Sequence, residues 1–60
     1  MNNLLPSDPF ILMSFINTKL RDRYQSLSEL CDDLGIDASL ITEQLKEIGM
    51  EYDSKLNKFW

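Results

Sequence analysis

The nucleophilic side chains of this sequence include one cysteine and six serines. A serine hydroxyl needs a neighbouring base, most often histidine, and the sequence contains no histidine. Cys31 is followed directly by Asp32 and Asp33, and it falls in the apolar stripe of a predicted helix. Burial and neighbouring anions both raise the pKa of a thiol, so we expect Cys31 to be a small core residue. A chain of 60 residues also buries too little surface to enclose a substrate cavity, so we do not expect an enzyme.

The sequence also lacks a recognisable pattern of metal ligands. Zinc sites need several cysteines or histidines, and this sequence has one cysteine and no histidine. Asp32, Asp33 and Asp37 offer carboxylates, but the segment lacks the alternating ligands and the closing glutamate of a calcium loop. A glycine-rich phosphate loop is absent from the sequence as well. We therefore expect no metal and no cofactor.

The most suggestive polar pair is Asn17 and Arg21. They are four residues apart in a predicted helix, so they share one edge of it. An amide and a guanidinium on such an edge could bind a carboxylate or a backbone segment of a partner. Two structural alternatives remain open: an ion pair from Arg21 to an acid of the second helix, and a hydrogen bond from Asn17 to the start of the terminal hairpin.

Helix-start residues divide the chain into elements that we expect to form one domain over residues 1–60. Asp8 and Pro9 are an N-cap and a first-turn proline. Ser26 and Glu29 have the spacing of a capping box. The expected elements are a lead-in over residues 1–7, helices over 8–23, 27–34 and 38–48, and a hairpin over 50–60.

Two glycines mark the expected ends of the second and third helices. Gly35 supplies a left-handed C-cap, Asp37 caps the next helix, and Gly49 ends it. The segment after Gly49 alternates apolar and charged residues, as a strand does, before a turn-forming stretch over residues 54–57. The sequence therefore predicts a mainly α fold: a small three-helix bundle that contains a helix-turn-helix and ends in a short C-terminal β-hairpin.

Helical periodicity predicts which apolar side chains form the core. We expect the core to contain the stripes of the three helices and the aromatic residues of the hairpin: Leu12, Met13, Ile16, Leu20, Tyr24, Leu27, Leu30, Cys31, Leu34, Ala38, Ile41, Leu45, Ile48, Tyr52, Phe59 and Trp60.

The first helix has more apolar surface than one face can bury. Ile11 and Phe15 project away from the core stripe, with Phe10 at their border. An exposed apolar patch of this kind marks a contact with another chain, either a second copy or an unrelated protein. The alternative is that Leu4 and Leu5 of the lead-in fold back and cover it.

The segment over residues 26–60 resembles a winged helix-turn-helix. The residues that carry the resemblance are Cys31 four positions before the turn glycine, Ile36 after it, and the apolar series Ile41, Leu45 and Ile48. This resemblance implies DNA binding by the exposed face of the third helix. The charge opposes it, because residues 26–49 carry six acidic side chains and one basic one. The remaining basic residues that could contact nucleic acid are Arg21, Arg23, Lys55 and Lys58.

A longer resemblance covers nearly the whole chain. It is carried by the stretch over residues 8–22 and continues through Tyr24, Ser26, Leu27, Leu30, Cys31, Gly49, Tyr52, Asn57 and Phe59. These residues are similar to those of a family of short, uncharacterised bacterial proteins catalogued as a domain of unknown function. Met50 and Lys58 depart from its pattern, in which an aromatic residue and glutamine are common. The resemblance implies a stand-alone bacterial protein without an assigned activity, cofactor or catalytic residue.

We expect the chain to be a protein-interaction module, either a homo-oligomer or an adaptor, with helix-turn-helix nucleic-acid binding as the alternative. The expected partner contacts are Phe10, Ile11, Phe15, Asn17 and Arg21. The longest apolar run has four residues, against about 18 to 20 needed to span a membrane. No basic segment precedes this run to form a secretory signal. We therefore expect a cytoplasmic protein with no membrane contact and a net charge of −4.

Overall fold

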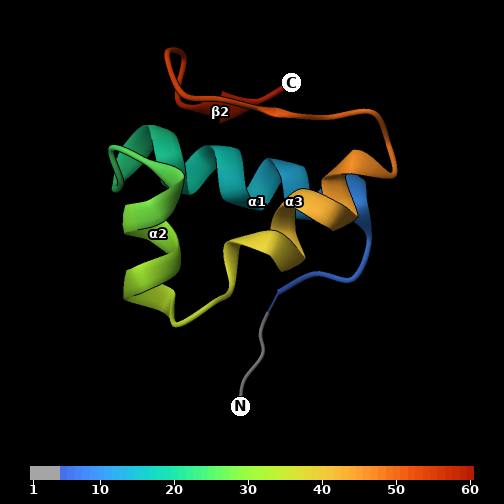
Figure 1. The fold of residues 1–60 in the computed structure, drawn as a ribbon, viewed down its shortest axis with the longest axis horizontal. Coiled ribbons are helices and arrows are strands. Elements are labelled where there is room, and N and C mark those ends of the chain that lie inside the picture. Colours follow the sequence, from blue (N-terminus) through green and yellow to red (C-terminus); the bar gives the residue numbers. More distant parts are fainter. Residues whose placement is uncertain (1–4) are drawn as a thin grey trace.

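The computed structural model describes residues 5–60, which form three helices and a two-stranded hairpin. The elements are α1 (Pro9–Asp22), α2 (Leu27–Leu34), α3 (Ala38–Lys46), β1 (Tyr52–Asp53) and β2 (Lys58–Phe59). Helix α1 crosses the middle of the molecule and the hairpin lies along one side of it (Figure 1). Helix α1 contacts α2, α3 and β2. The predicted mainly α fold with a short C-terminal hairpin is confirmed.

Helix α1 begins where the sequence predicts. The Asp8 carboxylate accepts hydrogen bonds from the backbone N–H groups of Phe10, at 2.8 Å, and Ile11, at 3.3 Å. Pro9 takes the first helical position, where a missing N–H is harmless. At the other end Arg23 is the C-cap, so the helix proper is one residue shorter at each end than the expected span.

Helix α2 has the predicted cap at each end. The Ser26 hydroxyl accepts a hydrogen bond from the Glu29 N–H at 3.1 Å. The Glu29 carboxylate reaches back to the N–H of Gln25 at 3.1 Å, one residue before the capping serine. Gly35 ends the helix with φ at 69°, a left-handed conformation that side chains with a Cβ adopt at a cost.

We expect Ser26→Ala to lower the free energy of unfolding by about 1 kcal/mol, because the Glu29 N–H loses its acceptor. Urea unfolding followed by circular dichroism measures this change. Ser28→Ala is the matched control, because Ser28 is exposed in the same helix. Equal effects of the two substitutions would contradict the capping role of Ser26.

Helix α3 ends earlier than predicted. Asp37 caps its start by accepting from the Ser39 N–H at 3.0 Å, as expected. The α-helix stops at Lys46, and the chain continues in a tighter turn to Gly49, whose φ is 77°. The Met50 N–H then bonds to the Leu45 carbonyl at 3.0 Å, which closes the end of the helix. The expected end at Ile48 is therefore two residues too far.

The hairpin pairs its two strands in an antiparallel register, with Tyr52 opposite Phe59 and Asp53 opposite Lys58. Asp53 shapes the turn, because its carboxylate accepts from the backbone N–H groups of Lys55, at 2.8 Å, and Leu56, at 3.1 Å. These bonds hold the pKa of Asp53 below its usual value, so the carboxylate stays ionised at a lower pH than an ordinary aspartate does.

The core lies where α1, α2, α3 and the inner face of the hairpin meet. Its buried members are Leu12, Ile16, Leu20, Leu27, Leu30, Cys31, Ile41, Leu45 and Phe59. Among the expected core residues, Met13, Tyr24, Ala38, Ile48 and Tyr52 are half-buried against this cluster.

Two side chains expected in the core are exposed. Leu34 is 40% exposed, because the last turn of α2 extends past the core before Gly35. Trp60 is 63% exposed. Phe59 points inward, so strand alternation directs Trp60 to the opposite face of the hairpin.

Over residues 5–60, no helix is both long enough and apolar enough to cross a membrane.

Candidate interaction site between helix α1 and the hairpin

Asn17 fastens strand β2 to helix α1. Its side-chain Nδ2 donates to the Phe59 carbonyl at 2.9 Å, and its Oδ1 accepts from the Phe59 N–H at 2.8 Å. The amide thus satisfies both backbone groups of Phe59, as a neighbouring strand would. The structure realises the alternative in which Asn17 bonds to the hairpin, at its second strand. This amide is engaged within the fold and is not available to a partner while the hairpin is docked.

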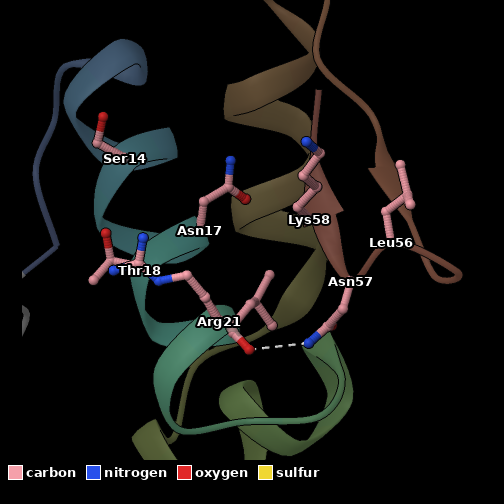
Figure 2. A pocket seen from close by; sticks show the side chains of 8 residues that line it. Ser14, Asn17, Thr18, Arg21, Leu56, Asn57 and Lys58 are labelled. Carbon is pink, nitrogen blue, oxygen red and sulfur yellow. Dashed lines mark hydrogen bonds between the residues drawn. The ribbon is translucent and has the colours of Figure 1, made fainter.

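Asn57 makes a second connection between the hairpin and α1, directly before strand β2. Its Nδ2 donates to the carbonyls of Leu20 and Tyr24, both at 3.0 Å, in the last turn of α1 (Figure 2 shows the bond to Leu20). Its Oδ1 accepts from the Tyr52 hydroxyl at 2.6 Å, and that hydroxyl accepts from the Leu27 N–H at 3.2 Å. One side chain therefore connects the end of α1, the hairpin and the start of α2.

A groove lies between this edge of α1 and the hairpin (Figure 2). Its volume is about 580 Å³. The lining residues are Ser14, Asn17, Thr18, Leu20 and Arg21 of α1, and Leu56, Asn57 and Lys58 of the hairpin. We call it the α1 groove. Asn17 and Asn57 fix its shape, because they hold β2 at a set distance from the helix.

Two cations line the α1 groove. Arg21 lies on the helix side and Lys58 on the hairpin side, 37 positions apart in the sequence. The Arg21 guanidinium pairs with its neighbour Asp22 at 2.9 Å, not with an acid of α2. This pairing lowers the pKa of Asp22 and raises that of Arg21, but both side chains are largely exposed, so the pair stabilises little. The Lys58 ammonium lies 5.3 Å from the centre of the Trp60 ring.

Exposed apolar side chains border the groove. Phe10 is 59% exposed, and its spacing from Ser14, Asn17 and Arg21 puts it on the same edge of α1. Leu56, 52% exposed, belongs to the groove lining on the hairpin side. An anionic segment with apolar residues would meet matching groups along this edge.

The other two members of the predicted apolar patch differ from Phe10. Ile11 is 58% exposed but is rotated about 100° around the helix from Phe10, away from the groove. Phe15 is half-buried against the core, with the Lys19 ammonium 5.5 Å from its ring centre. Leu5 packs against the core and leaves Phe10 and Ile11 exposed, whereas Leu4 lies outside the described residues.

The structure divides the four cations expected for nucleic-acid contacts. Arg21 and Lys58 line the α1 groove. Arg23 is the exposed C-cap of α1, and Lys55 lies in the hairpin turn next to Asp53. Two of the four cations therefore share one groove.

Cys31 is buried in the core, 6% exposed. Its burial, and then the charges of Asp32 and Asp37, raise the pKa of the thiol. No other described residue brings a base to it, and residues 5–60 contain no group of three or more side chains that could hold a metal ion.

We expect Cys31 to react at least tenfold more slowly with a disulfide reagent at pH 8 in the folded protein than in urea. The raised pKa leaves less thiolate at this pH, and burial blocks the reagent. Because the pKa is higher in the folded state, Cys31 also lowers stability as the pH rises past the ordinary thiol pKa. The absorbance of the thiolate that the reagent releases measures the reaction rate. Equal rates in the folded protein and in urea would contradict the buried position of Cys31.

The sequence interpretation did not identify Asn57 as a structural tie. Its available signal was an asparagine at the end of a turn-forming stretch, since asparagine tolerates the left-handed backbone that it adopts here with φ at 55°. The sequence places Lys58 among the four candidate nucleic-acid contacts. Its position across the groove from Arg21 depends on how the hairpin docks on α1, which the sequence pattern does not show.

The fold and groove together define a small mainly α domain with a docked C-terminal hairpin and a groove lined by two cations. The chain belongs to the DUF4250 family, a domain of unknown function, whose model matches residues 6–59. The predicted resemblance to such a family is confirmed. No curated protein and no solved structure matches the chain, so no structural relative supports the winged helix-turn-helix resemblance.

Proposed function

We propose that this protein is a non-catalytic protein-interaction module that binds a partner chain in the α1 groove. The observation that carries the proposal is the groove itself, which brings Arg21 and Lys58 together with the exposed side chain of Leu56. Phe10 is exposed further along the same edge of α1. Cations beside apolar side chains suit a protein segment that carries both a carboxylate and apolar residues. The partner is either a second copy of the chain or another protein.

The charge of the chain favours a protein partner over nucleic acid. A duplex is bound by several phosphate contacts, and the groove supplies two cations, one of which is paired with Asp22. The net charge of −4 repels a polyanion at longer range. A carboxylate on a folded partner needs only one or two such contacts.

Nucleic-acid binding is the second candidate, and the convergence of Arg21 and Lys58 in one groove is the observation in its favour. A fluorescence-anisotropy titration with random duplex at low salt separates the two proposals. The protein-interaction proposal expects no binding. Binding that weakens steeply with salt and disappears in Arg21→Glu would favour nucleic acid.

Sedimentation equilibrium over a wide concentration range, compared with the 7.0 kDa chain mass, tests which partner occupies the groove. If the partner is a second copy, the wild type dimerises, and Phe10→Ser or Arg21→Glu returns it to a monomer. If the wild type is a monomer, affinity capture with the same variants tests a different protein. Ser28→Glu, at an exposed position of α2, is the control for added charge.

We also propose that the module acts in the cytoplasm, and that it is a bacterial protein, as the family resemblance implies. A fluorescent fusion, or fractionation of cells that produce the protein, tests this location. Recovery in the membrane or secreted fraction would contradict it.

A further inference from the structure

The two outer edges of the hairpin differ in whether their backbone groups have hydrogen-bond partners. Glu51 and Trp60 exchange two backbone hydrogen bonds, each 3.1 Å. Because such pairs alternate in an antiparallel ladder, the next pair, Tyr52 and Phe59, points its backbone groups outward. Asn17 satisfies the outward groups of Phe59. Within residues 5–60, no backbone or side-chain group bonds to the outward N–H and carbonyl of Tyr52.

The edge of β1 is therefore open, and space lies beside it. A hollow of about 450 Å³ separates β1 from α3. Its lining consists of Thr42, Glu43 and Lys46 of α3, with Met50, Glu51, Tyr52 and Phe59 of the hairpin segment. An unpaired strand edge is a template for another strand, and a neighbouring hollow receives every second side chain of that strand.

The charges next to this edge select the occupant. Glu51 and Asp53 flank Tyr52 and share a second hollow with the exposed ring of Trp60. The Lys58 ammonium already lies 5.3 Å from the centre of the Trp60 ring, and Lys58 is opposite Asp53 in the strand pair. Glu51 has no ion-pair partner among residues 5–60, so it is the acid of this edge that attracts a further cationic side chain. Lys55 lines the same hollow and Lys46 lines the inner one, each beside an acid: Asp53 and Glu43 respectively.

A second copy of the chain is a poor occupant. Two β1 strands paired antiparallel about Tyr52 would place Glu51 of each copy opposite Asp53 of the other. Like charges directly opposite one another destabilise a strand pair.

We propose that the open edge of β1 binds an extended, cationic segment of another protein by strand addition. Tyr52 supplies one backbone donor and one acceptor, a lysine or arginine side chain of the segment lies over Glu51, and the residue two positions further along lies opposite Asp53. The side chain between them enters the hollow beside α3. This edge is separate from the α1 groove, so it does not depend on the function proposed for that groove.

An amide-resolved NMR titration tests the proposal with a blocked peptide of alternating lysine and valine, five residues long. We expect the Tyr52 amide resonance to shift and its hydrogen exchange to slow several-fold at saturation. In the free protein we expect the Tyr52 amide to exchange quickly and the Phe59 amide, which donates to Asn17, to be protected.

Glu51→Lys should weaken the lysine peptide about fivefold or more, because it replaces an attraction by a repulsion. Asp32→Lys, an equal charge change at an exposed position of α2, should leave the affinity unchanged. Arg21→Glu should retain binding, which separates this edge from the groove. Far-UV circular dichroism verifies that each variant is folded.

Four results would overturn the proposal. The first is that the Tyr52 amide resonance does not shift with millimolar peptide, and the second is that a peptide with glutamate in place of lysine binds equally well. The third is that Glu51→Lys and Asp32→Lys weaken binding equally. The fourth is protection of the free Tyr52 amide that grows with protein concentration, since a second copy would then occupy the edge.

Discussion

Asn57→Ala should lower the free energy of unfolding by about 3 kcal/mol, the largest effect we expect from a single polar substitution in this chain. The substitution removes the two bonds to the α1 carbonyls and the acceptor of the Tyr52 hydroxyl. It also places an alanine at a φ of 55°, which adds about 1 kcal/mol of backbone strain. A domain of this size has a total stability of about 5 kcal/mol, so the variant should melt far earlier.

Asn57→Gly separates the two causes. Glycine adopts the same φ without strain, so only the lost hydrogen bonds remain and the expected cost is about 2 kcal/mol. Urea unfolding monitored at 222 nm gives both values. If both variants keep wild-type stability, the connection that Asn57 makes between α1, the hairpin and α2 does not contribute to the fold.

Asn17→Ala should lower the free energy of unfolding by about 2 kcal/mol, because Phe59 loses the partners of both its N–H and its carbonyl. Phe59 is itself 1% exposed, so a loosened β2 also exposes part of the core. We expect the Phe59 amide to lose its protection from hydrogen exchange in this variant, while helical content is kept.

Thr18→Ala is the matched control for Asn17→Ala. Thr18 is the next residue of α1, is exposed and lines the same groove, so its loss should change stability by no more than about 0.5 kcal/mol. A protected Phe59 amide in Asn17→Ala would contradict the assigned role of this side chain.

The helix starts were predictable because each depends on a few neighbouring residues. Asp8, Ser26 and Asp37 cap the helices from the positions that their spacing indicates. The left-handed Gly35 and the hairpin were predictable for the same reason, since local conformational preferences decide them.

Features that depend on tertiary packing were harder to predict. The periodicity of α2 includes Leu34, but only the arrangement of the helices shows that the core ends one turn earlier. Similarly, the α-helical hydrogen bonds of α3 end at Lys46 because the chain tightens there to reach Gly49. A stripe of apolar residues predicts neither the exposure of Leu34 nor the end of α3 at Lys46.

The candidate site was predictable only on its helical side. Asn17 and Arg21 share an edge of α1 because of their spacing alone. Asn17 holds the hairpin through a residue 42 positions away, and Lys58 lines the same groove as Arg21, 37 positions away. No helical or strand pattern encodes such a distance.

Photo-crosslinking from the α1 groove tests the proposed function most directly. A photoreactive phenylalanine analogue replaces Thr18, which is exposed within the groove, and in a control replaces Ser28 on exposed α2. In cells that produce the protein, we expect Thr18 to give a discrete crosslink to a protein, either a second copy or another chain, that is lost in Arg21→Glu. Crosslinks to nucleic acid, or none beyond those from Ser28, would contradict the account.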